Sequence, residues 1–179
     1  HSDTKNPAVA AAGTTLLFGV PNIISEQKQT QDLTGYRPRK AHTYDYAQTK
    51  GDELLGTNAC PIFRASEAYL NYIEACYEKN GTLDSKAQEY WKAIRRRAGV
   101  DEDYQKTIAR TDLGREDDLG VYSGDRMVDA TLYNIRRERR CEFIAEGMRW
   151  DDLKRWRSWD RLFTEPYIVE GINFWDALF

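Results

Sequence analysis

The chain has 179 residues, of which 41% are apolar and 12% aromatic, a composition that suits one folded domain with a substantial core. Its 26 basic and 29 acidic residues leave a formal net charge of −3, which excludes a general electrostatic preference for nucleic acid or anionic membranes. Three widely separated cysteines, Cys60, Cys76 and Cys141, and only two histidines indicate neither a disulfide framework nor a metal centre. No stretch reaches the roughly 18 consecutive apolar residues of a membrane-spanning helix.

The first 60 residues predict an irregular segment with short extended pieces. Pro7, Pro21 and Pro38, together with several glycines, interrupt any regular pattern. Residues 14–20 and 43–46 are the exceptions, because they are rich in residue types that favour strands. We therefore expect loops and short strands in this part of the chain.

Three tyrosines, Tyr36, Tyr44 and Tyr46, are the candidate binding residues of this segment. Aromatic rings offer an apolar face to the C–H groups of a sugar and a polar edge to its hydroxyls, and loops commonly carry binding residues. Tyrosines that pack a loop onto a helical core would give the same pattern, so both interpretations stay open.

The pattern changes at Pro61, after which apolar residues recur every three or four positions. This periodicity predicts an amphipathic helix over residues 62–79 that ends at Asn80 and Gly81, and a second helix from Asp84 to Gly99. A connection of about four residues predicts that the two helices form an antiparallel hairpin. Small and aromatic residues alternate on both helices and resemble a tetratricopeptide unit, in which small side chains allow close helix contact. They are Ala68, Tyr72 and Ala75 on the first helix and Ala87, Tyr90 and Ala93 on the second.

Three further helices are expected. The first covers residues 101–110 and is followed by a polar, glycine-containing loop over residues 114–124, which we expect to be solvated. The next two helices cover residues 129–146 and 149–162. Their apolar positions, which we expect to be buried at least in part, are Leu132, Ile135, Phe143 and Ile144, then Trp150, Leu153, Trp156 and Trp159.

An acidic stripe lies on the helix expected at 129–146, because Glu138, Glu142 and Glu146 recur every four residues. Such a stripe repels itself unless basic side chains from elsewhere lie against it. We interpret it as one side of a set of charge pairs that fix how the helices meet. The candidate partners are Arg64, Arg95, Arg96, Arg97 and Arg149.

Other interpretations of the charged residues are less well supported. A carboxylate di-iron site would need Glu-x-x-His motifs on facing helices, and no predicted helix contains histidine. The basic runs at residues 95–97 and 136–140 would suit nucleic-acid phosphates only if their side chains shared one face of a helix. Consecutive helical residues point about 100° apart, so each run is spread around its helix instead. No nucleophile elbow, paired Cys and His or glycine-rich phosphate loop is present, so the sequence supports no catalytic chemistry.

Three ordered motifs resemble the C-terminal part of SusD/RagB-type proteins. The first is PIFRASEAYLNYIEA over residues 61–75, and the second is IRRRAG over residues 94–99. The third joins IRRERRCE at residues 135–142 to EGMRWDDLKRW at residues 146–156. The resemblance is strong over about residues 60–157 and weaker over residues 34–40.

This resemblance implies a mainly helical fold with tetratricopeptide-like hairpins over residues 61–179, after an irregular segment at residues 1–60. It also implies a surface lipoprotein of the outer membrane that captures oligosaccharides or other nutrients and delivers them to a TonB-dependent transporter. Such a protein is not an enzyme and needs no cofactor. We assign the charged motif residues to helix packing and not to ligand binding. They are Arg64, Glu67, Arg95, Glu138, Arg139, Glu142, Glu146, Arg149 and Asp152.

Family members are commonly about three times as long as this chain, and the lipid-anchored cysteine of the family is not in it. We therefore expect a C-terminal fragment, attached to a membrane only through an anchor outside this sequence. Two other functions remain open. One is a helical protein-interaction module that binds no glycan, and a weaker one is an enzyme with an unrecognised carboxylate site.

Overall fold

The computed structural model describes Lys40 and residues 61–163. The chain divides into two compact units, and residues 61–163 lie in the unit that spans Pro61–Pro166. The strands predicted at residues 14–20 and 43–46 lie outside the described residues, as do the three candidate binding tyrosines.

The first described helix, α3 (Ala65–Asn80), begins three residues later than predicted. Arg64 has an extended backbone, with φ −128° and ψ 143°, and its carbonyl oxygen accepts the first-turn hydrogen bond from the Glu67 N–H. The side chains of Ile62 and Phe63 are therefore outside the helix, and they are 82% and 87% exposed instead of contributing to its apolar face. At the other end Gly81 has φ +69° and donates its N–H to the Tyr77 carbonyl, which stops the helix as predicted.

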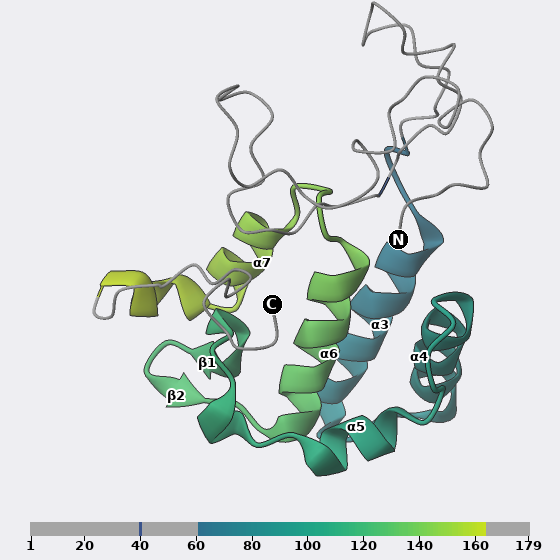
Figure 1. The fold of residues 1–179 in the computed structure, drawn as a ribbon, viewed down its shortest axis with the longest axis horizontal. Helices are drawn as coiled ribbons and strands as arrows, with labels where there is room; N and C mark the ends of the chain where they lie inside the picture. Colours follow the sequence, from purple (N-terminus) through teal and green to yellow (C-terminus); the bar gives the residue numbers. More distant parts are fainter. Residues whose placement is uncertain (1–39, 41–60, 164–179) are drawn as a thin grey trace, which may run out of the picture. The chain divides into compact units, whose positions relative to one another are not determined.

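Helix α4 (Ser85–Arg97) lies beside α3 and confirms the predicted hairpin (Figure 1). Asp84 caps it by accepting a 2.7 Å hydrogen bond from the Ala87 N–H. The expected contact through small residues is wrong for α3, because Ala68 and Ala75 are exposed. Larger side chains fill the interface instead, namely Leu70, Ile73, Trp91 and Ile94, with Tyr69 stacked on Tyr90.

Helix α5 (Tyr104–Arg110) is capped by Asp103 and leads into residues 111–128. This connection is not the solvated loop that we expected, because Asp118 and Val121 are buried. It contains two short 3-10 helices, η3 (Leu113–Arg115) and η4 (Leu119–Val121), followed by strands β1 (Tyr122–Ser123) and β2 (Arg126–Met127). The strands pair antiparallel, with Tyr122 opposite Met127 and Ser123 opposite Arg126.

Helix α6 (Ala130–Glu142) begins at its predicted position, because Asp129 accepts hydrogen bonds from two backbone N–H groups of its first turn. It ends four residues earlier than predicted, because Ala145 and Gly147 both adopt positive φ, at 62° and 78°. The chain therefore leaves the helix, and Ile144 is 59% exposed instead of partly buried.

The final predicted helix is divided in two. Helix α7 (Arg149–Arg155) is followed by a 3-10 helix, η5 (Ser158–Phe163), because Arg157 has φ +57°. Leu153 and Trp156 are buried as expected, whereas Trp150 is 55% exposed.

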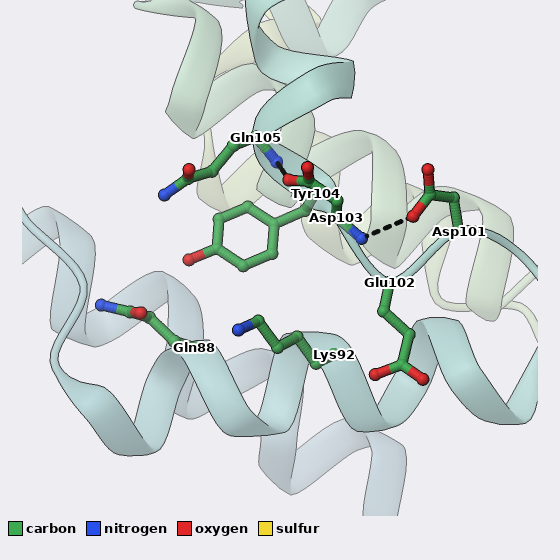
Figure 2. Close-up of a pocket in the computed structure, with 7 residues that line it drawn as sticks. All are labelled: Gln88, Lys92, Asp101, Glu102, Asp103, Tyr104 and Gln105. Atoms are coloured by element: carbon green, nitrogen blue, oxygen red, sulfur yellow. Dashed lines mark hydrogen bonds between the residues drawn. The ribbon is translucent and has the colours of Figure 1, made fainter.

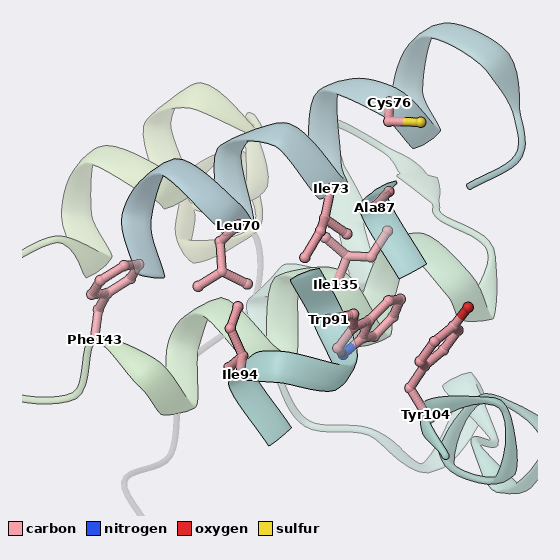
Figure 3. Close-up of a cluster of buried hydrophobic side chains, with 9 residues drawn as sticks. All are labelled: Leu70, Ile73, Cys76, Ala87, Trp91, Ile94, Tyr104, Ile135 and Phe143. Atoms are coloured by element: carbon pink, nitrogen blue, oxygen red, sulfur yellow. The ribbon is translucent and has the colours of Figure 1, made fainter. Parts of the chain in front are cut away.

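The core of the unit lies between α3, α4 and α6 (Figure 3). The rings of Trp91 and Tyr104 stack in it with centroids 4.3 Å apart and an interplanar angle of 5°. Over residues 61–163 the protein is thus mainly helical with one small two-stranded sheet, which confirms the predicted fold class. None of the described helices has the length and apolar character needed to cross a membrane. The buried side chains of the core cluster are Leu70, Ile73, Cys76, Ala87, Trp91, Ile94, Tyr104, Ile135 and Phe143.

Candidate functional site

Glu138, the first residue of the acidic stripe, joins α6 to α4. Its Oε2 accepts 2.8 Å hydrogen bonds from Arg95 Nη1 and from the indole N–H of Trp91. Arg95 also donates to the hydroxyl of Thr107 on α5 at 3.2 Å. One carboxylate and one arginine therefore hold three helices in a fixed arrangement.

Glu142 and Glu146 hold the beginning of α3 against the end of α6. The Arg64 guanidinium lies 2.8 Å from a carboxylate oxygen of each, and it also donates to the Glu142 carbonyl at 3.1 Å. Arg97 at the end of α4 forms an ion pair with Glu142 as well. Arg96, another candidate partner of the stripe, pairs with Glu102 on the surface instead.

A second charge network joins α3, α6 and α7. Arg139 Nε is 2.7 Å from both carboxylate oxygens of Asp152, and its Nη1 donates to Asn71 at 2.7 Å. Glu74 accepts two hydrogen bonds from Arg155 and one, of 2.6 Å, from the Trp156 indole N–H. Arg139, Asp152 and Glu74 are all buried, so their charges are balanced inside the protein.

A third network holds the connection 111–128 against α6 and α7. The buried carboxylate of Asp118 pairs with Arg149 at 2.6 Å and with Arg140. Arg149, a candidate partner of the acidic stripe, thus forms its ion pair with Asp118. The Tyr133 hydroxyl donates to Glu116 at 2.6 Å, and burial together with this bond raises the pKa of Tyr133.

Several residues of these networks were not identified from the sequence. Glu74 could have been found, because it lies four residues after Leu70 on the apolar face of α3, where a carboxylate needs a buried partner. Asp118 gave no comparable signal, since its partners depend on how a loop folds back. Glu67, a predicted packing residue, is half-buried and lines a cavity between α3, α6 and α7.

This cavity has a volume of about 740 Å³. Its charged groups are mostly engaged with each other, including the Glu74–Arg155 and Asp152–Arg139 pairs. Arg136 also lines it, 2% exposed, and donates to the Gly120 and Tyr122 carbonyls and to the Ser123 hydroxyl. Burial lowers the pKa of Arg136. The hollow therefore presents structural ion pairs and few groups that remain available for a ligand.

A smaller pocket of about 470 Å³ lies between α4 and the start of α5 (Figure 2). This volume is within the range of small-molecule sites. Amide, ammonium, phenol and carboxylate groups line it, so it offers both donors and acceptors of hydrogen bonds. Sequence reasoning did not single out this pocket, because its residues come from two helices and no local motif joins them. The lining residues are Gln88, Lys92, Asp101, Glu102, Asp103, Tyr104 and Gln105.

Among residues 61–163, no group of three His, Cys, Asp or Glu side chains is placed to bind a metal ion. The arrangement of the described acids is instead that of carboxylates paired with arginine. This geometry provides stable helix packing and polar pockets.

Comparison with known proteins agrees with the family resemblance seen in the sequence. Searches of curated proteins and of solved structures gave no significant match. The model of the SusD family matches residues 18–172, which is most of the chain. Proteins of that family are outer-membrane surface lipoproteins that bind glycans or other nutrients together with a SusC-type partner, and they are not catalysts. The chain therefore belongs to the SusD family.

Proposed function

We propose that this chain takes part in capturing oligosaccharides at the outer-membrane surface and in delivering them to a TonB-dependent, SusC-like transporter. The observation that carries the proposal is the family match over residues 18–172. The charged motif residues support it indirectly. They hold helices together, as expected for the scaffold of a binding protein, and do not converge on a reaction centre.

We also propose Tyr36, Tyr44 and Tyr46 as residues that stack on sugar rings. They lie outside the described residues, so the support is chemical. A tyrosine ring combines an apolar face with a polar edge, and all three occur in a proline- and glycine-containing segment of the kind that often carries binding residues.

A glycan array followed by isothermal titration calorimetry on the 179-residue chain tests this proposal. The chain is expected to bind at least one oligosaccharide saturably. Changing Tyr36, Tyr44 or Tyr46 to alanine is expected to weaken binding about tenfold or more, as loss of one aromatic stack should. The matched Tyr→Phe changes keep the ring and should largely preserve affinity. A chain that binds no oligosaccharide on the array would refute glycan capture by these residues.

A second candidate function is docking onto a protein partner without any glycan binding. Exposed apolar side chains favour it, because Ile62, Phe63, Trp150 and Phe163 are each more than half exposed. This function predicts that the chain binds a SusC-like transporter in a purified two-component assay. It also predicts that no sugar on the array binds, which separates it from the first proposal.

A further inference from the structure

The pocket between α4 and α5 contains a buried polar side chain, Tyr104. Only 4% of Tyr104 is exposed, and its ring is fixed by stacking on Trp91 in the core. Figure 2 shows the hydroxyl directed toward the space beside the side-chain amides of Gln88 and Gln105. The core thus holds the ring of a pocket-lining tyrosine in a fixed position, with little conformational freedom left to lose on binding.

Donor and acceptor groups surround this hydroxyl. The Gln88 amide nitrogen donates to the Leu83 carbonyl at 3.0 Å, which orients the amide and leaves its oxygen as an acceptor. Gln105 and Lys92 line the same pocket and supply an amide and an ammonium group. Groups of both kinds within one small pocket suit adjacent hydroxyls, because each hydroxyl both donates and accepts.

Two of the carboxylates that line the pocket are held in place by cations that do not line it. Glu102 accepts hydrogen bonds of 2.7 and 2.6 Å from Arg96, and Asp101 accepts one of 2.9 Å from Lys106. These bonds lower the pKa values of both acids, so both are charged at neutral pH. Together with Asp103 they make three carboxylates in a lining with one ammonium group, which disfavours an anionic ligand.

We propose that this pocket binds one neutral sugar residue of a captured oligosaccharide, with the Tyr104 hydroxyl and the amides of Gln88 and Gln105 recognising its hydroxyls. The inference rests on the proposed function, which supplies the ligand class. It adds a site built from described residues, in addition to the proposed Tyr36, Tyr44 and Tyr46. The volume of about 470 Å³ accommodates a single pyranose ring with part of its neighbour.

Tyr104→Phe is the decisive variant, because it removes one hydroxyl and keeps the ring that stacks on Trp91. Calorimetry on the 179-residue chain would use hexaoses of glucose, mannose and xylose as neutral probes and an oligogalacturonide as the acidic one. Tyr104→Phe is expected to weaken binding of the neutral probe about fivefold to tenfold, the effect of one net hydrogen bond. Gln105→Ala, a change at an exposed side chain, should weaken it to a similar extent.

Tyr133→Phe is the matched control, since it removes a buried hydroxyl that bonds Glu116 outside this pocket. Its affinity for the probe should equal that of the unmodified chain. If the chain binds a neutral hexaose but neither Tyr104→Phe nor Gln105→Ala changes the affinity, the pocket assignment is wrong and glycan capture stands. Preference for the oligogalacturonide would overturn the assignment to a neutral sugar. Absence of binding to every probe would overturn the pocket site together with the proposed glycan capture.

Discussion

At the scale of single residues, the buried arginines carry much of the specificity of the fold. Arg139 shows this clearly, because it combines a double contact to Asp152 with a hydrogen bond to Asn71 and lies over the Phe143 ring at 5.0 Å. A buried charge is costly unless it is paired. Removing either Arg139 or Asp152 would therefore leave the other with a buried charge that has lost its main partner.

Arg139→Met is expected to destabilise the protein by about 3–5 kcal/mol, because it leaves the buried Asp152 carboxylate with only Arg155 as an ion-pair partner among the described residues. Urea unfolding followed by circular dichroism measures the change. Adding Asp152→Asn should recover part of the loss, since the unpaired charge is then removed. Arg96→Met, which breaks a surface pair, is the control and should leave the urea midpoint nearly unchanged. Equal effects from the two arginine changes would contradict this account.

At the scale of elements, helix ends are set by a few polar or left-handed residues. Asp84 caps α4 through the Ala87 N–H and also accepts a 2.8 Å hydrogen bond from the Tyr72 hydroxyl. These bonds, with the Ala87 contribution largest, hold the pKa of Asp84 below its ordinary value of 3.8. The cap therefore links the stability of the hairpin to pH.

The stabilising effect of Asp84 should disappear in acid. Because its folded pKa is lower than its unfolded pKa, the contribution is present above about pH 4 and is lost as pH falls through the folded pKa. The difference in unfolding free energy between the unmodified chain and Asp84→Ala should thus shrink from pH 7 toward pH 3, in urea titrations at each pH. Asp117→Ala, at an exposed loop position, should show no such trend. A difference that grows in acid would exclude this role of the cap.

Ala145, which follows α6, has φ +62°, a backbone conformation that costs a non-glycine residue about 1 kcal/mol. Ala145→Gly should relieve this strain and raise the free energy of unfolding by about 0.5–1 kcal/mol in urea titrations. Gly147→Ala, two residues on at φ +78°, should lower it by a similar amount. A loss of stability in Ala145→Gly would show that Ala145 is not strained.

Helix positions could be predicted from apolar periodicity, and caps such as Asp84 and Asp129 fixed two of the starts correctly. The remaining ends could not be predicted, because tertiary contacts decide them. Arg64 stays extended while its side chain reaches Glu142 and Glu146, and no local signal reports partners about 80 residues away. The acidic stripe follows from helical spacing, and three of its five candidate partners, Arg64, Arg95 and Arg97, do pair with it. The other two, Arg96 and Arg149, pair with Glu102 and Asp118 instead, which depends on the fold.

At the scale of the unit Pro61–Pro166, α6 is the central element. It contacts α3, α5 and η4, and it reaches α4 through the hydrogen bond between Trp91 and Glu138. Six of its 13 residues are buried, namely the five consecutive residues from Leu132 to Arg136 and the separate Arg139. Helix α7, by contrast, has seven residues and two buried side chains.

Native-state hydrogen exchange should therefore be slowest in α6. Its central amides are expected to exchange only through global unfolding, with the same dependence on urea as the equilibrium transition. Amides of α7 and η5 should exchange through smaller openings with lower free energies, because fewer of their contacts are buried. Uniform protection across α6 and α7 would show that the whole unit opens as one.

The separation in sequence between paired charges also affects how the protein is made. Arg64 precedes Glu146 by 82 residues, and Glu74 precedes Arg155 by 81. During synthesis on the ribosome, the α3–α4 hairpin therefore emerges with charges whose counterions have not yet been translated. The charge of Glu74 cannot be buried against Arg155 until α7 leaves the exit tunnel, so a nascent chain stalled before that point should remain open to proteases.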